Sequence, residues 1–243
     1  MTVTGHLNEL RKRLFLSVLV FVALSVASFV FIERFVALAL GLSPAFDFVY
    51  LSPAELVTSY MKLALVLGLV FSSPFILWEI WAFVAPGLTE RESRAAGAAL
   101  VAGFVFFLIG ALFCFTVILP ITLQFFYDFN GSRDITASIS FNSYMSFILG
   151  MLVAFGVVFE MPVLSYLLAR LGLLGPGLLV KGRKYAVLLI FILAAVITPP
   201  DVVSQIMTAV PMLALYELSI LVSRTAYKAR RASEDEDESE DEE

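Results

Sequence analysis

Long runs of apolar residues, separated by short polar connections, dominate the chain. A helix needs about 20 apolar residues to cross the roughly 30 Å hydrocarbon core of a bilayer. Six stretches stand out against this length: 14–32, 63–78, 95–127, 144–168, 185–198 and 202–222. The pattern therefore predicts an all-α membrane protein with six transmembrane helices.

Two of these stretches depart from a simple span. The third is longer than one crossing and contains Pro120, so we expect it to bend or leave the membrane there. The fifth has only 14 residues, which reach about 21 Å as a helix. We expect a curved, cupped helical wall with short fifth and sixth spans that thin the bilayer or need protein neighbours. The alternative is that flanking residues reach the interface and nothing functional follows.

Composition supports the membrane assignment and divides the chain. Hydrophobic residues make up 60% of it and the mean hydropathy is +0.94, more than a soluble core of this size could bury. The formal charge of −5 is misleading, because nine of the 21 acidic residues lie in 234–243. We therefore expect a six-span membrane domain over residues 1–223 and an acidic, disordered cytoplasmic tail over 224–243.

Basic residues predict the orientation of the spans, because cytoplasmic loops are enriched in them. With the N-terminus inside, 13 of the 16 basic residues lie in cytoplasmic segments. The remaining three are Arg34, Lys62 and Arg133. We therefore expect both termini in the cytoplasm. The same rule accounts for Arg11 and Arg13 without any binding role.

The sequence offers little for catalysis. His6 and Cys114 are the only residues of their kinds, so a His-Glu-x-x-His metal site and a disulfide framework are both excluded. No Gly-x-Ser-x-Gly elbow is present either. We predict no enzyme activity, no cofactor, no metal and no nucleic-acid partner. A proton-coupled small-solute transporter stays open as an alternative, with Glu160 as its proton relay.

Several short strings carry a resemblance to a known family. They are His6–Leu14, Pro74–Leu88 with the charged run Glu90–Arg94, Phe155–Pro162, Thr198–Gln205, and Pro211 before Leu215–Glu217. Together, and in this order, they closely resemble TatC, the large subunit of the twin-arginine translocase, from His6 to about Arg224. The resemblance implies a protein of the prokaryotic cytoplasmic membrane that binds signal peptides carrying two consecutive arginines. It also implies recruitment of small single-span TatA/TatB-type subunits, export of folded proteins driven by the proton-motive force, and self-association within the complex.

By similarity, Glu9 and Glu92 match the positions where the family contacts the arginine pair. A carboxylate can accept two parallel hydrogen bonds from arginine, which lysine cannot reproduce. We expect Trp81 and Phe83 to shield these contacts from water. The alternative is that Glu9 and Glu92 simply pair with the neighbouring Arg13 and Arg94.

A second group of polar residues lies inside the membrane. An acidic residue in mid-membrane is costly, so Glu160 should face protein or water, and Pro162 should free backbone carbonyls beside it. We expect Glu160 to form an inward polar site for the signal peptide or a partner helix; a protonated carboxyl bonded within the fold is the alternative. The resemblance adds Gln205 and Asp201, from the region that the family uses for partner contact.

Overall fold

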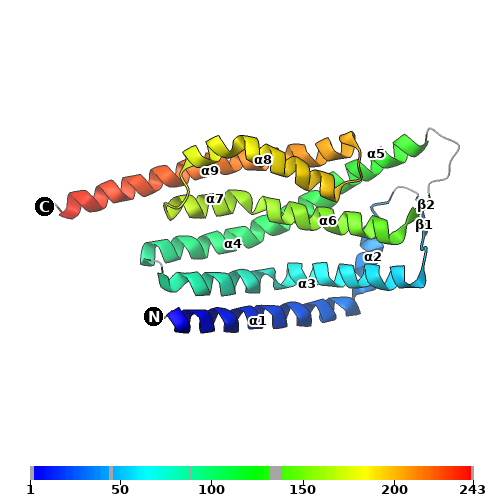
Figure 1. The fold of residues 1–243 in the computed structure, drawn as a ribbon, viewed down its shortest axis with the longest axis horizontal. Coiled ribbons are helices and arrows are strands. Elements are labelled where there is room, and N and C mark those ends of the chain that lie inside the picture. The colour runs from blue at the N-terminus through cyan, green and yellow to red at the C-terminus, as the bar shows by residue number, and fades with distance from the viewer. Residues whose placement is uncertain (1–2, 44–45, 88, 132–137, 242–243) are drawn as a thin grey trace. The chain divides into compact units, whose positions relative to one another are not determined.

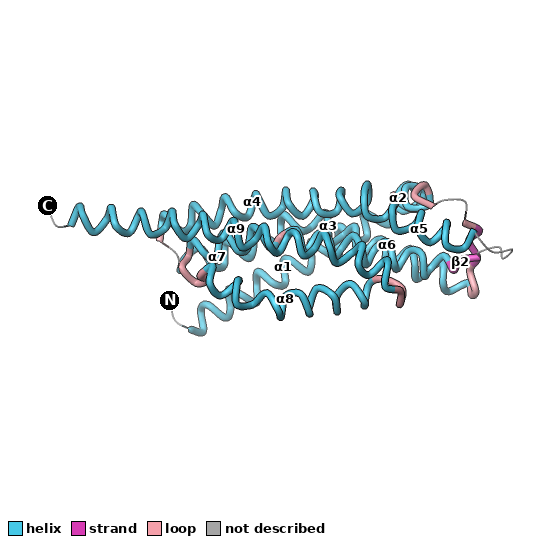
Figure 2. Tube along the Cα trace, turned by 90° about the horizontal axis from the view of Figure 1, so that it is seen from above, coloured by secondary structure: helices cyan, strands magenta, loops and turns pink. Residues whose placement is uncertain are grey.

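The computed structural model describes residues 3–43, 46–87, 89–131 and 138–241 (Figure 1). Helices account for nearly all of this trace (Figure 2). In chain order they are α1 Val3–Val30, α2 Ile32–Leu40, α3 Pro53–Val84, α4 Glu90–Phe113, α5 Leu119–Gly131, α6 Phe141–Phe159, α7 Met161–Arg170, α8 Pro176–Ile197 and α9 Val202–Asp241. Two short strands, β1 Asp47–Val49 and β2 Ser138–Ser140, pair in parallel. The helical class is as predicted, whereas the small sheet was not foreseen.

Five segments of the described chain are long and apolar enough to cross a membrane: Leu7–Val30, Pro53–Gly87, Ser93–Phe129, Phe141–Arg170 and Val202–Arg231. The predicted fifth span lies in α8, which does not meet this criterion because three basic residues, Lys181, Arg183 and Lys184, occupy its first half. The predicted sixth span lies in α9, which continues unbroken far beyond the apolar stretch because good helix formers follow it. The length of the part of α9 that crosses a membrane stays a prediction.

The acidic end of the chain belongs to the same helix. The backbone of α9 is helical through Asp241, so the boundary expected after residue 223 falls inside one continuous element. The structure describes no side chain beyond Arg231. The division into a membrane domain and a cytoplasmic tail therefore stays a prediction.

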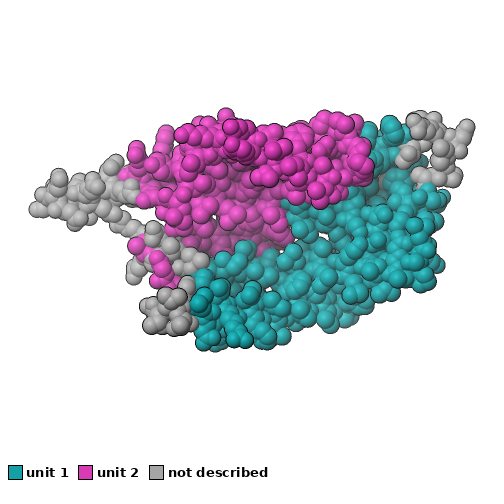
Figure 3. All heavy atoms as spheres, viewed as in Figure 1, with its two compact units in different colours: residues 1–84, 111–155 teal, residues 85–110, 156–243 magenta. Residues whose placement is uncertain are grey.

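The chain forms two compact units (Figure 3). The first comprises residues 1–84 and 111–155, and the second comprises residues 85–110 and 156–243. In the first unit, α1 and α3 run antiparallel, since Arg13 bonds to Glu79 while Ser25 lies against Gly68. Small residues allow this close approach, as is common between helices in membranes. On α3 they recur every fourth residue, as Ala64, Gly68 and Ser72.

Polar contacts gather where α2, α3 and α6 meet the two strands in the first unit. The Tyr144 hydroxyl donates to the Ala39 carbonyl at 2.7 Å. Lys62 Nζ donates to Asn142 Oδ1 and to Ser146 Oγ, both at 2.9 Å. The Glu55 carboxylate accepts a bond from Ser140 Oγ at the end of β2. These contacts hold the start of α6 to α3, and so fix the end of the unit where the sheet lies.

Prolines shape the long helices locally. Pro120 lacks the N–H that would bond to the Thr116 carbonyl, and a π-helical turn, Cys114–Ile118, immediately precedes it. The chain therefore continues from α4 into α5 with the distortion placed before the proline, where a bend was expected. In α3, Pro74 leaves the Val70 carbonyl without its usual donor, and Ser73 Oγ donates to that carbonyl at 2.7 Å. The serine thus satisfies the group that the proline releases.

In the second unit, α7 packs against α9. Both helices carry small buried side chains, among them Ser165 and Ala169 on α7, and Ala209, Ser219, Ser223 and Ala226 on α9. α8 is joined to α9 by three polar contacts. Tyr216 donates to the Leu179 carbonyl at 2.7 Å, Gln205 Nε2 donates to the Phe191 carbonyl at 3.1 Å, and Arg183 pairs with Glu217 at 2.7 Å.

Gly172 ends α7 in the left-handed region, with φ of 73°. The amide of Leu173 bonds to the Leu168 carbonyl and that of Gly172 to the Ala169 carbonyl, which is the Schellman pattern. A Cβ built on Gly172 would lie 1.1 Å from Arg230 Nη1. The Arg230 guanidinium, from α9, thus occupies the space that a side chain at residue 172 would fill. It lies beside the C-terminus of α7, and a helix C-terminus favours a cation.

We expect Gly172→Ala to lower the free energy of unfolding by about 1–2 kcal/mol, because alanine is strained at this φ and displaces Arg230. The thermal unfolding midpoint in detergent measures the effect. Gly175→Ala is the matched control, since Gly175 has negative φ and no atom lies within 4 Å of its built Cβ. Equal midpoints for the two variants would contradict the expectation.

Candidate functional site

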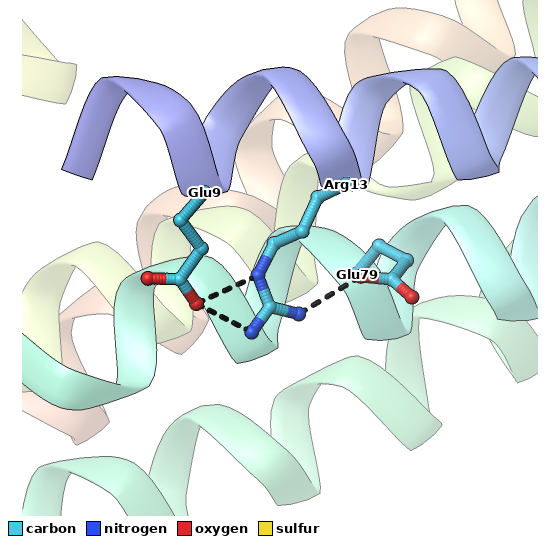
Figure 4. Close-up of polar contacts among 3 residues, drawn as sticks. All are labelled: Glu9, Arg13 and Glu79. Carbon is cyan, nitrogen blue, oxygen red and sulfur yellow. Dashed lines mark hydrogen bonds and ion pairs between the residues drawn. The ribbon is translucent and has the colours of Figure 1, made fainter. Parts of the chain in front are cut away.

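A three-residue ion cluster joins α1 to α3 in the first unit (Figure 4). The Arg13 guanidinium donates from Nε at 3.0 Å and from Nη2 at 2.7 Å to the same oxygen, Oε1 of Glu9. Its third nitrogen, Nη1, donates at 2.8 Å to Oε2 of Glu79. All three nitrogens of the guanidinium are therefore engaged, by carboxylates from two helices.

The helices dictate this arrangement. Glu9 and Arg13 are four residues apart on α1, so they lie on one face of the helix, one turn apart. Glu79 comes from α3, which runs antiparallel to α1 and approaches it closely at Gly68. The exposed fractions of the three side chains are 28% for Glu9, 26% for Arg13 and 12% for Glu79. The cluster is therefore partly withdrawn from solvent, where charged hydrogen bonds count for more than at a fully exposed surface.

Two carboxylates surround one guanidinium, so the cluster carries one unbalanced negative charge. Each carboxylate uses one oxygen for Arg13, and the other oxygen accepts no hydrogen bond from the described part of the chain. The arrangement can therefore attract a second cation, and it has acceptors with which to bind one.

The predicted aromatic residues lie just beyond Glu79 on α3. Trp81 and Phe83 are half-buried, and the Trp81 ring lies 5.0 Å from that of Trp78, centroid to centroid. Trp78 is 54% exposed. Indole rings of this kind favour the interface between lipid and water, and here they extend from the turn of α3 that carries Glu79.

The predicted partner of Glu9 can be placed only in part. Glu92 lies in the first turn of α4, but its side chain is outside the described residues. The pairing of Glu9 with Arg13, which was the alternative to a role in signal binding, is observed, whereas the expected approach of Glu9 and Glu92 stays a prediction.

Two residues of the cluster were not identified from the sequence as site residues. The bias of basic residues toward the cytoplasm accounts for Arg13, and Glu79 belongs to none of the predicted site residues. The spacing of Glu9 and Arg13 was a usable signal for their pair. The contact with Glu79 has a sequence separation of 66 and needed the packing of α1 on α3 to become visible.

Glu160 lies at the junction of α6 and α7, in the second unit. A Cβ built on Gly103 of α4 would lie 2.7 Å from Glu160 Oε2. One turn along, a Cβ built on Gly156 would lie 2.7 Å from the Phe107 ring. Each of the two segments thus packs a large side chain against a glycine of the other. Glu160 lies against Gly103, and Phe107 lies against Gly156. This reciprocal fit fixes the position of the carboxyl group.

One oxygen of Glu160, Oε1, is buried and has no hydrogen-bond partner among the described residues. A buried acceptor without a donor is costly, and so Glu160 is not an ordinary satisfied core residue. Pro162 is buried in the first turn of α7, where its missing N–H costs little. The helix is interrupted at Glu160 alone, whose backbone keeps right-handed helical φ and ψ of −71° and −20°, and it resumes at Met161.

The remaining predicted residues have structural contacts. Asp201 precedes α9, and its carboxylate accepts a bond from the Ser204 amide at 2.7 Å, the usual arrangement of a helix N-cap. Gln205, one turn into α9, bonds to α8 as described above. Both residues therefore fix the tight turn from α8 to α9. Within the described residues no group of three or more His, Cys, Asp or Glu side chains could hold a metal ion.

Comparison with known proteins gives a consistent result. The family model described as Sec-independent protein translocase protein (TatC) matches residues 5–211. TatC of Carboxydothermus hydrogenoformans is 38% identical over 92% of this chain and 93% of its own length. TatC of Aquifex aeolicus is 35% identical over 95% of this chain and 98% of its own length.

A solved structure agrees with these relatives. A crystal structure described as that of the twin-arginine translocase receptor TatC superposes with a TM-score of 0.82 at 36% sequence identity. It covers 91% of this chain and 99% of the solved one. Both sequence and fold are thus shared along almost the entire length.

Proposed function

The chain belongs to the TatC family of Sec-independent protein translocases, and on that premise we propose that it is the signal-peptide receptor of a twin-arginine translocase. It binds signal peptides with two consecutive arginines on folded cargo. It then recruits small single-span subunits of the TatA/TatB type, and it self-associates within the complex. Export is driven by the proton-motive force.

The observation that carries the proposal is the cluster of Glu9, Arg13 and Glu79. It holds a guanidinium between two partly buried carboxylates and leaves one negative charge unbalanced. Arginine presents its donors in a fixed planar fork, whereas the lysine ammonium is a point charge. A site that engages all three nitrogens of one guanidinium therefore favours arginine over lysine.

We assign the second arginine of the signal to Glu92. Its backbone opens α4, and a carboxylate in the first turn of a helix is compatible with the helix dipole. Trp81 and Phe83 contribute shielding from water, because fully exposed ion pairs contribute only about 0–1 kcal/mol each. The apolar stretch of the signal then lies along the helices toward the membrane interior.

In the membrane interior, Glu160 is the group proposed to meet a polar group of the signal or of a partner helix. Its support is the buried oxygen without a donor in the described chain and the interruption of the helix at Glu160, two residues before Pro162. Asp201 and Gln205 act by holding the α8–α9 turn on which a single-span partner docks. The short apolar part of α8 favours such a neighbour, since mismatch with the bilayer is costly there.

The proposal includes a topology. Six spans, with α8 as the short fifth, place both termini on the cytoplasmic side of a prokaryotic plasma membrane. The excess of basic residues in the corresponding loops supports this orientation. It puts Glu9, Glu79 and Glu92 on the side from which folded cargo arrives.

Binding of a fluorescent signal peptide to the purified protein in lipid discs tests the proposal. We expect the Arg-Arg peptide to bind about fivefold or more tighter than its Lys-Lys twin, as the loss of one hydrogen bond of about 1 kcal/mol would give. Glu9→Ala and Glu92→Ala should each abolish the preference. Glu33→Ala is the matched control, because Glu33 is an exposed carboxylate in the first turn of α2, beyond the far end of α1.

A wild-type protein that binds neither peptide, or both equally, would reject the receptor role. The alternative is then the proton-coupled transporter, for which proton flux through reconstituted wild type and Glu160→Gln is the measurement. Loss of flux in the variant would support that alternative.

A further inference from the structure

The guanidinium site at Glu9 and Glu79 is occupied in this structure by a residue of the chain itself. Arg13 fills it with three hydrogen bonds of 2.7–3.0 Å. The fit shows that the two carboxylates are spaced for one guanidinium. An arginine from another chain that entered between them would have to take the place of Arg13.

We propose that Arg13 is a resident competitor for the arginine-binding site, and that Glu79 is a further carboxylate of that site. The inference rests on the proposed receptor function. In the protein without a signal peptide, Arg13 is bonded to both Glu9 and Glu79 and keeps their side chains in place. An arginine of the signal peptide then replaces Arg13 between the two carboxylates.

The position of Arg13 permits this exchange. Its side chain is 26% exposed and lies near the start of α1, so the guanidinium can swing out to the headgroup region, where long basic side chains commonly reach. The released arginine keeps its charge and finds lipid phosphates there. The net exchange is one guanidinium for another, so the two carboxylates are never left buried without a cation, which would be the costly state.

Competition of this kind has a measurable consequence. The apparent affinity for a ligand equals the intrinsic affinity multiplied by the fraction of protein whose site is open. A partly exposed ion pair of ordinary strength leaves the site open in a minority of molecules, and removing the competitor should then tighten binding about two- to fivefold. Removing Glu79 as well should cancel the gain, because one of the two carboxylates is then lost to the signal arginine.

The test measures the affinity of the Arg-Arg signal peptide in lipid discs for wild type, Arg13→Gln, Arg13→Lys and Arg13→Gln/Glu79→Gln. We expect Arg13→Gln to bind about two- to fivefold tighter, Arg13→Lys to bind with intermediate affinity, and the double variant to return to wild type or below. Arg13→Lys keeps the charge, so tightening in this variant cannot come from reduced repulsion of a cationic peptide.

Lys12→Gln is the matched control for charge. Lys12 is the exposed neighbour of Arg13 on α1, and its replacement removes the same charge without opening the site. Affinity of Arg13→Gln equal to or weaker than that of Lys12→Gln would overturn the proposal and make Arg13 a positioning residue. An Arg-Arg preference that is absent from the wild type would instead reject the receptor function, so the two failures are distinguishable.

Discussion

Gly68→Val is expected to separate α1 from α3 and to destabilise the first unit. A Cβ built on Gly68 would lie 2.0 Å from Ser25 Oγ and 2.7 Å from Ser25 Cα. The second atom belongs to the backbone, so no rotamer change relieves the contact and α1 must move. We expect a cost at the upper end of the roughly 1–3 kcal/mol of overpacking, measured as the thermal unfolding midpoint in detergent.

The same substitution should reach the candidate site. Arg13 and Glu79 bond across the α1–α3 interface that Gly68 closes, so a displaced α1 pulls the guanidinium from the carboxylate. We therefore expect Gly68→Val to reduce signal-peptide binding as well. Gly177→Val is the control, because no atom lies within 4 Å of a Cβ built there. A Gly68 variant as stable as this control would refute the close packing.

Gly156→Leu is expected to displace Glu160 and to destabilise the second unit. A Cβ at residue 156 would lie 2.7, 3.0 and 3.1 Å from three atoms of the Phe107 ring. Phe107 is only 7% exposed, so its ring has little room to retreat. We expect a loss of about 1–3 kcal/mol from overpacking, again measured by thermal unfolding.

A compensating variant makes this prediction specific. Phe107→Ala removes the ring that the new leucine would strike, so Gly156→Leu/Phe107→Ala should recover part of the stability lost in Gly156→Leu. Additive losses in the double variant would show that the two residues do not share the contact. Recovery would support the fit that also positions the Glu160 carboxyl against Gly103.

The contacts of Glu9 and Glu79 with Arg13 differ in how far the sequence predicts them. The Glu9–Arg13 pair could be anticipated because both residues lie on one helix, where a spacing of four residues fixes their geometry. The bond from Arg13 to Glu79 depends on how two helices meet. The close packing of the two helices depends on Gly68 and Ser25. The sequence shows that both residues are small, but it does not show that they contact each other.

The position of Glu160 shows the same division. Its cost inside a membrane span follows from the sequence alone, since an acidic residue in an apolar run needs protein or water around it. Which group faces it does not follow. Gly103 is recognised as the neighbour of Glu160 only from the packing of α4 against the end of α6. Glycine has no side chain whose chemistry would indicate such a contact in the sequence.

The sequence by itself determined the helical membrane class, the approximate limits of the apolar stretches and the TatC family. Each of these follows from local properties: hydropathy over about 20 residues, the distribution of basic residues, and ordered short motifs. Only the tertiary structure shows that a parallel pair of strands forms between 47–49 and 138–140, and that Arg13 occupies the carboxylates of Glu9 and Glu79. The β pairing and the contact with Glu79 join residues far apart in the chain, so their energy depends on packing that no local pattern encodes.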